Sequence, residues 1–134
     1  MAKQTKAGKG GKEPNIPDSE LEVMRMLWRE RKATARKVWS LLQEEGSKWT
    51  YATVNTLLQR LEQKGYATSD KTQMTYVYSP KKEKKDVISK KVKALVDKLY
   101  DGAGGALAMH VLERHRLSPE DRSKIQDILD SSKK

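Results

Sequence analysis

The segment TYATVNTLLQRLEQK, residues 50–64, has helix signals at both ends and along its length. Thr50 is a residue type that caps helix N-termini, and Lys64 followed by Gly65 is a typical helix end. Apolar residues recur between these ends at helical spacing and form one stripe: Val54, Leu57, Leu58 and Leu61. We therefore predict an amphipathic helix that buries this stripe and exposes a polar face.

Two more helices are predicted upstream. Residues 18–30 place an apolar stripe on one side of a helix, and Ser19 with Glu22 has the spacing of a capping box. After a connector at residues 31–33, Thr34 has the position of an N-cap, and a second helix runs until Gly46. The two stripes are Leu21, Met24, Leu27 and Trp28, and then Ala35, Val38, Leu41 and Leu42.

Downstream of Gly65 the pattern changes to that of a hairpin. YATSD (66–70) and MTYVYSP (74–80) are rich in Tyr, Thr and Val, and they flank a polar tip at residues 71–73. Three helices followed by a hairpin are typical of a winged helix, with the hairpin as the wing. Trp28, Trp39 and Trp49 lie in or beside the helical stripes, so we predict that they pack in the core and do not stack on bases.

The residues after Pro80 form a different region. A lysine-rich apolar stripe precedes Gly102, Gly104 and Gly105, which we expect to break the helix, and helices over 106–115 and 118–131 follow. Ser118 and Pro119 are a good start signal for the last helix. Three short amphipathic helices have too little core to fold alone, so we predict a homodimer. The predicted dimerisation residues are Ile88, Val92, Leu95, Val96, Leu99, Leu107, Val111, Leu112, Ile125, Ile128 and Leu129.

The predicted fold class is mainly α, and the chain divides into three regions. Residues 1–13 form a disordered basic tail, 14–80 a winged-helix DNA-binding domain and 81–134 a helical dimerisation domain. The tail is able to lie along a DNA backbone or to serve only as a solubilising arm.

Composition indicates a polyanionic partner. The 28 Lys and Arg exceed the 18 Asp and Glu, which gives a net charge of +10. Such an excess displaces counterions from phosphates, although a basic surface is also compatible with simple solvation. The absence of cysteine excludes disulfides, thiolate metal sites and thiol nucleophiles.

No enzymatic, cofactor or metal site is expected. His110 and His115 are five residues apart, so they do not share a helix face as a metal pair at i, i+4 would, and no phosphate-binding loop or nucleophile elbow is present. No apolar run reaches the roughly 18 residues that a membrane span needs. No apolar segment follows the N-terminal lysines, so we expect a cytoplasmic protein without membrane insertion.

Double-stranded DNA is the expected partner, read by the helix over 50–64. In a helix-turn-helix the N-terminal residues of this helix lie closest to base edges. Asn55 pairs well with adenine, and threonine methyl groups suit thymine, which favours a half-site with A·T pairs. The predicted base-facing residues are Thr50, Ala52, Thr53, Asn55 and Thr56, and the predicted phosphate contacts are Lys48, Arg60, Lys64 and Lys71. The alternative is that Thr50 is only a cap, Asn55 only a surface residue and Arg60 a partner of Glu62 or Glu44.

Four strings resemble the penicillinase (beta-lactamase) repressor family, which includes methicillin-resistance and copper-responsive repressors. They are SELEVMRMLW (19–28), WTYATVNTLLQRLEQKGY (49–66), YVYSP (76–80) and DKLYDGAGGALAMHVLERHRLSPE (97–120), and the resemblance covers about residues 16–131. It implies a winged helix, a helical dimerisation region and a dyad-symmetric operator. In many members it also implies an upstream membrane-bound sensor protease, whose signal leads to cleavage of the repressor in its first C-terminal helix.

Three departures limit what the resemblance implies. The antibiotic-responsive members are cut at an Asn-Phe bond, where this chain has Ala94 and Leu95. The copper-responsive members carry a C-terminal cysteine cluster, and this chain has none. Ala52 and Asn55 stand where members carry Lys and Arg. Neither the cleavage site nor the operator sequence is therefore transferred.

The predicted function is a sequence-specific, homodimeric transcriptional repressor. The alternative is a non-specific architectural protein that coats DNA with its Lys-rich tail and the lysines from 81 to 93. A winged helix used only to bind proteins is a third possibility, but the exposed face of the 50–64 helix lacks a large apolar patch.

Overall fold

The computed structural model describes residues 16–132, so the predicted tail at residues 1–13 lies outside the described part. The chain divides into two compact units between Val87 and Ile88, within helix α4 (Lys84–Tyr100). The first unit therefore includes residues 81–87, which the sequence analysis assigned to the C-terminal region.

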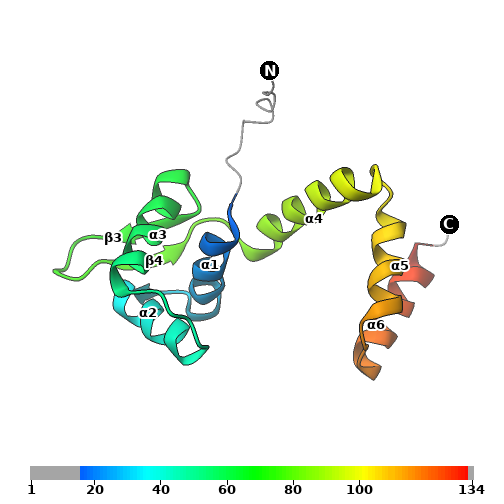
Figure 1. The fold of residues 1–134 in the computed structure, drawn as a ribbon, viewed down its shortest axis with the longest axis horizontal. Helices are drawn as coiled ribbons and strands as arrows, with labels where there is room; N and C mark the ends of the chain where they lie inside the picture. Colours follow the sequence, from blue (N-terminus) through cyan, green and yellow to red (C-terminus); the bar gives the residue numbers. More distant parts are fainter. Residues whose placement is uncertain (1–15, 133–134) are drawn as a thin grey trace, which may run out of the picture. The chain divides into compact units, whose positions relative to one another are not determined.

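Three helices form the body of the first unit: α1 (Asp18–Glu30), α2 (Ala35–Glu44) and α3 (Tyr51–Lys64) (Figure 1). The predicted caps of α2 and α3 are confirmed, because Thr34 Oγ1 accepts a bond from the Lys37 amide and Thr50 Oγ1 accepts one from the Thr53 amide, each at 3.1 Å. Gly65 ends α3 in the left-handed conformation, with φ of 87°, which glycine adopts without strain.

The predicted capping box of α1 is wrong. The helix begins at Asp18 with Pro17 in the N-cap position, and no side chain caps it. The Pro17 carbonyl instead accepts a hydrogen bond from the Leu21 amide at 2.9 Å. Ile16 is buried just before this turn, so packing sets the start of α1 where a local side-chain signal was expected.

The sheet has three strands, one more than predicted. The wing strands β3 (Ala67–Asp70) and β4 (Val77–Pro80) pair antiparallel, and β2 (Ala33–Thr34) adds to the other edge of β4. Residues 71–76 form the loop between β3 and β4, which projects beyond the helices (Figure 1). Met74 to Tyr76, which were predicted in the return strand, therefore lie in this loop.

The core of the first unit lies between the three helices and the sheet. The predicted stripe of α3 is buried, and so are the stripe of α2 and most of that of α1. The tryptophan prediction is confirmed, because Trp28 is buried and Trp39 and Trp49 pack against the core. The Trp28 indole also donates to the Lys82 carbonyl at 2.9 Å, which ties the chain after the wing to α1. Val87 completes the core, which explains why the start of α4 belongs to this unit.

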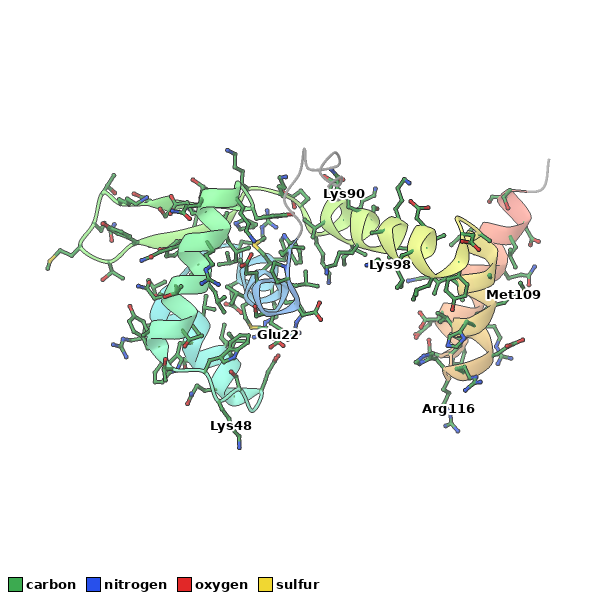
Figure 2. All side chains as sticks on the ribbon, turned by 45° about the horizontal axis from the view of Figure 1, so that its top comes forward. Glu22, Lys48, Lys90, Lys98, Met109 and Arg116 are labelled. Carbon is green, nitrogen blue, oxygen red and sulfur yellow. The ribbon has the colours of Figure 1, made fainter. Side chains whose placement is uncertain are left out.

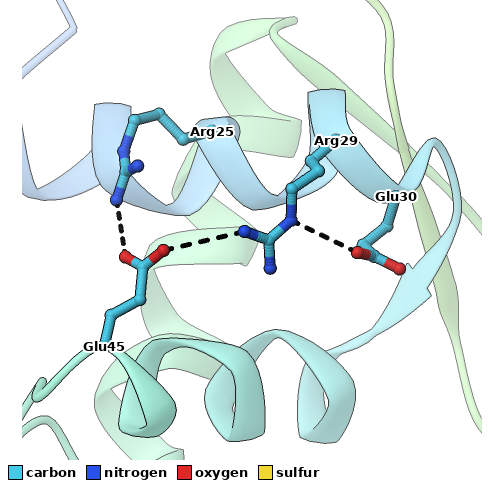
Figure 3. Close-up of polar contacts among 4 residues, drawn as sticks. All are labelled: Arg25, Arg29, Glu30 and Glu45. Atoms are coloured by element: carbon cyan, nitrogen blue, oxygen red, sulfur yellow. Dashed lines mark hydrogen bonds and ion pairs between the residues drawn. The ribbon is translucent and has the colours of Figure 1, made fainter.

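Ion pairs join α1 to the other helices. Glu45, at the end of α2, accepts a bond from Arg25 at 2.9 Å and lies 3.7 Å from Arg29 (Figure 3). Glu20 is only 2% exposed, and its carboxylate lies 2.8 Å from Lys64 Nζ at the end of α3. A buried carboxylate requires such a partner, so this second pair fixes the start of α1 against the end of α3.

The second unit contains the rest of α4 together with α5 (Gly104–Arg114) and α6 (Pro119–Ser131) (Figure 1). Ser118 caps α6 as predicted, accepting a bond from the Asp121 amide at 3.0 Å. Gly102 lies in the break after α4 with φ of 84°, whereas Gly104 and Gly105 begin α5. The predicted helix break is therefore shorter than expected.

Most predicted dimerisation residues are exposed in the single chain. Val96 is buried, and Leu107 and Ile125 are half-buried. Leu99 is 63% exposed and Ile128 66%, and Met109 on α5, labelled in Figure 2, is exposed as well. The other exposed members of the predicted set are Ile88, Val92, Leu95, Val111, Leu112 and Leu129.

Candidate nucleic-acid interface

The first two turns of α3 present a small, polar, solvent-facing surface. Ala52, Thr53 and Thr56 are exposed and Asn55 is half-buried, while Val54 between them is fully buried. Thr50 caps the helix, and its hydroxyl lies 3.1 Å from that of Thr53. The structure thus brings the predicted base-facing residues together at the N-cap and in the first two turns of α3. Their contact with bases stays a prediction.

A shallow cavity lies between α3 and the wing loop. It has a volume of about 280 Å³. Asn55 and Gln59 of α3 line it together with three tyrosines. The complete lining is Ala35, Tyr51, Asn55, Gln59, Met74, Thr75, Tyr76 and Tyr78. Asn55, a predicted base-facing residue, therefore lies where α3 and the wing loop meet.

Glu62 anchors the wing to α3. Its carboxylate accepts bonds from Ser69 Oγ at 2.7 Å and from Lys71 Nζ at 2.9 Å, and Lys71 also donates to Ser69 at 2.7 Å. The bonds from Lys71 and then Ser69 lower the pKa of Glu62, and the bond to Glu62 raises the pKa of Lys71. Lys71 Nζ also lies 5.5 Å from the centroid of the Tyr76 ring on the other side of the wing loop. Lys71 thus connects α3, β3 and the returning wing loop.

The turn after β3 is stabilised by hydrogen bonds between its own residues. Asp70 Oδ1 accepts bonds from the Thr72 hydroxyl at 2.7 Å and the Thr72 amide at 2.9 Å. These two bonds, the hydroxyl first, lower the pKa of Asp70. This is the side-chain-to-backbone turn that aspartate commonly forms. The first half of the wing loop is therefore held by its own residues.

The four predicted phosphate-binding cations differ in their surroundings. Lys48 is exposed on the loop between α2 and α3, as Figure 2 shows, and Arg60 is exposed on α3. Within residues 16–132, Arg60 forms no ion pair with Glu62 or Glu44, the partners considered from the sequence. Lys64 and Lys71 instead pair with Glu20 and Glu62. Two of the four predicted phosphate-binding residues, Lys64 and Lys71, are therefore already ion-paired with a carboxylate of the same chain.

One group beside α3 was not identified from the sequence. The Arg36 guanidinium lies over the rings of Tyr51 and Trp39, with its Cζ 5.1 Å and 6.0 Å from the two centroids. Arg36 and Trp39 are three residues apart on α2, which places them on one helix face. Tyr51 begins α3, so only the packing of α3 on α2 brings all three together.

Residues 16–132 contain no group of three or more His, Asp or Glu side chains arranged to hold a metal ion. No helix in the same range is long and apolar enough to cross a membrane.

Comparisons with known proteins identify the family. Residues 16–131 match the model of the family described as penicillinase repressor. The penicillinase repressor of Bacillus licheniformis is 31% identical over 120 residues, which cover 90% of this chain and 93% of that protein. The methicillin resistance regulatory protein MecI of Staphylococcus aureus (strain N315) is 28% identical, over 85% of this chain and 92% of that protein.

A solved structure of a relative is also similar. It is the solution structure of the monomeric form of Bacillus licheniformis BlaI in complex with the blaP half-operator, which is 35% identical and covers 56% of this chain and 90% of that one, with a TM-score of 0.47. The family model covers residues 16–131, and the relative that is 31% identical carries the name of the same family. The chain therefore belongs to the penicillinase repressor family.

Proposed function

We propose that this protein is a sequence-specific DNA-binding transcriptional repressor, not an enzyme, and that it acts as a homodimer on a dyad-symmetric operator. The observation that supports this most is the exposed polar face of α3 beside an anchored wing, in a chain that has a relative named as a penicillinase repressor. A helix with this face and length suits the major groove, and a net charge of +10 suits a phosphate backbone.

Base recognition is assigned to the first two turns of α3. Asn55 is the residue with the donor and acceptor pair that matches adenine, and Thr53 and Thr56 offer hydroxyls and methyl groups for thymine. Ala52 and Thr50 allow close approach without charge. We therefore expect readout to depend mainly on uncharged groups, with A·T pairs in each half-site.

Phosphate binding is assigned chiefly to Lys48 and Arg60, which are exposed and basic. Lys64 and Lys71 remain candidates, but each would have to share its ammonium group with a carboxylate of the chain. A shared ammonium group releases fewer counterions when DNA binds, so we expect Lys64 and Lys71 to contribute less to the salt dependence.

A homodimer is supported by the exposed apolar residues of the second unit. Leucine, isoleucine and valine side chains on α4, α5 and α6 leave a large apolar surface on the single chain. Covering it with the same surface of a second copy gives a two-fold arrangement, which matches a dyad-symmetric site. An upstream membrane-bound sensor protease and a cytoplasmic location, both expected from the sequence, stay predictions.

The test is selection of bound duplexes from a random library, followed by binding measurements. We expect a palindromic consensus, a steep loss of affinity as salt rises, and an Asn55→Ala variant with lower selectivity, by about 1–3 kcal/mol at the affected base pair. Gln63→Ala, an exposed amide at the end of the same helix, is the matched control and should bind like the parent protein. Equal affinity for the selected duplex and a scrambled one would overturn the proposal.

The same measurement separates the alternative of a non-specific architectural protein. Removing residues 1–13 should leave selectivity intact if the winged helix reads the site. A loss of all DNA binding on removal of these residues would instead favour coating of DNA by basic segments.

A further inference from the structure

The group formed by Arg36, Tyr51 and Trp39 lies at the junction of α2 and α3. The two rings meet edge to face, with centroids 6.4 Å apart and an interplanar angle of 86°. Arg36 lies over both, closer to Tyr51. Arginine stacks favourably on aromatic faces, and the stack leaves the rim of N–H donors of its planar guanidinium available.

The aromatic support is itself fixed by hydrogen bonds. The Trp39 indole donates to the Trp49 carbonyl at 3.1 Å, and the Gln43 amide donates to the same carbonyl at 3.4 Å. This carbonyl precedes Thr50, the cap of α3, so the ring of Trp39 is tied to the start of the recognition helix. Tyr51 is the first residue of that helix. The guanidinium therefore stacks on two rings that are both attached to the start of α3, one by a hydrogen bond and one through the chain itself.

Arg36 differs from several other arginines of the first unit. Arg25 and Arg29 pair with Glu45, and Arg31 lies 3.4 Å from Glu83. Within residues 16–132, Arg36 forms no ion pair with a carboxylate. It is exposed, and the rings restrict its side chain without neutralising its charge. A restrained arginine loses less conformational entropy when it binds an anion than a free one does.

We propose that Arg36 binds a backbone phosphate of the DNA and that Tyr51 is a positioning residue that holds the guanidinium for this contact. The inference rests on the proposed function and deepens it by naming a phosphate contact outside α3. A phosphate fits better than a base, because α2 is the helix that crosses the backbone in a helix-turn-helix. The planar fork of arginine also matches two phosphate oxygens.

Tyr51 joins this contact to the base-reading face. Its ring supports Arg36 and also lines the cavity that contains Asn55. A change in the position of the Arg36–phosphate contact should therefore also change the position of the first turn of α3. Phosphate contacts at such places set the register in which the helix meets the bases.

The first experiment compares salt dependence in the full-length protein, with a duplex selected by the wild-type protein and a scrambled duplex of the same composition. Arg36→Met should lower affinity about tenfold or more and reduce the slope of log K against log salt by about 0.9. Arg116→Met is the control, because it removes the same charge from an exposed arginine of the second unit, labelled in Figure 2. It should leave the slope unchanged. An unchanged slope for Arg36→Met, or an equal change for both variants, would overturn the proposal.

A second measurement tests the role of Tyr51. Tyr51→Phe keeps the ring and should bind like the wild type, whereas Tyr51→Ala should weaken binding but retain the salt slope. In the Tyr51→Ala background, Arg36→Met should cost clearly less than in the wild type, because the two act through one contact. Additive losses would show that Tyr51 does not position Arg36. Circular dichroism of each variant checks that the fold is kept.

These outcomes are separate from those of the proposed function. A wild-type protein that binds selected and scrambled duplexes equally contradicts the repressor itself. A selective wild-type protein whose salt slope is indifferent to Arg36 contradicts only this inference.

Discussion

The first unit and the second unit bury their apolar residues differently. In the first, side chains from α1, α2, α3 and the sheet enclose one another, and residues such as Val54 and Leu58 are fully buried. In the second, α5 and α6 have no buried residue within the described range, and the ion pair between Lys93 and Asp97 on α4 joins neighbouring turns of one helix. The first unit thus contains its own core within one chain. The second leaves apolar side chains exposed on the single chain.

This difference indicates two kinds of stability. The first unit should unfold as an ordinary small domain whose free energy of unfolding does not depend on protein concentration. The second unit should gain its stability by association, so its free energy of unfolding should depend on protein concentration. Trp28, Trp39 and Trp49, the three tryptophans of the chain, all lie in the first unit. Tryptophan fluorescence therefore reports the first unit alone, whereas far-ultraviolet circular dichroism reports both.

The largest effect is expected from a core truncation in the first unit. Leu58→Ala removes a fully buried side chain and should cost about 3 kcal/mol in urea unfolding followed by tryptophan fluorescence. Leu129→Ala makes the same change at a position that is 56% exposed, and it should leave the fluorescence transition within about 0.5 kcal/mol. If both variants shift that transition equally, the two units unfold together and do not have separate stabilities.

The next effect concerns Lys64, whose partner Glu20 is buried. Lys64→Met leaves the Glu20 carboxylate without that cation and should destabilise the first unit by about 2–3 kcal/mol. Arg60→Met, one turn earlier on α3 and exposed, should leave stability unchanged but reduce the salt dependence of DNA binding. Urea unfolding and titration with duplex DNA measure the two effects. The opposite pattern would make Lys64 the phosphate contact and Arg60 the structural cation.

A charge on the apolar stripe of α4 tests the second unit directly. Val92→Glu places a carboxylate among exposed apolar residues and should raise the dimer dissociation constant about ten- to hundredfold. Ala94→Glu adds the same charge to an exposed position on another face of the same helix and should have little effect. Sedimentation velocity over a range of concentrations gives both constants. A wild-type protein that is monomeric at micromolar concentration and still binds DNA normally would rule out the paired half-site arrangement.

The smallest effect is a pH dependence at the wing anchor. The pKa of Glu62 lies below its ordinary value of 4.5, so its contribution to stability is present above pH 4.5 and is lost as the pH falls through the lowered pKa. Because Lys71 is half exposed, the contribution should stay below about 1 kcal/mol. Glu62→Gln should therefore be slightly less stable than the wild type at pH 7, with the difference vanishing at acid pH. Thermal unfolding monitored by fluorescence at several pH values checks this. A difference that grows on acidification would contradict the assignment.

The features predictable from sequence were those set by neighbouring residues. The caps at Thr34, Thr50 and Ser118 and the end of α3 at Gly65 need only a few residues of context, and all are confirmed. The apolar stripes were also predictable from local sequence, because a helix places residues three and four apart on one face regardless of what it packs against. The order of the three helices and the hairpin also followed from these patterns, and the match over residues 16–131 confirms the family resemblance.

The features that escaped prediction depend on contacts between distant segments. β2 is only two residues long, so it has no periodicity, and it exists because Ala33 and Thr34 meet β4. The pairing of Lys64 with Glu20 joins residues 44 positions apart. The stack of Arg36 on Tyr51 likewise forms only after α2 and α3 pack together. None of these contacts leaves a local pattern in the sequence.

The two caps of α3 also limit how much sequence information one copy is able to read. Thr50 and Gly65 fix the helix at 14 residues, and the base-facing residues proposed above lie in or before its first two turns. Two turns span about 11 Å, which corresponds to roughly three or four base pairs of DNA. A site of about four base pairs recurs by chance roughly once in 256 positions, far too often among the ~10⁶ or more competing sites of a genome. Reading two such sites at a fixed spacing lowers the chance frequency to about one in 65,000. A second copy therefore doubles the number of base pairs that are read, in addition to raising the affinity.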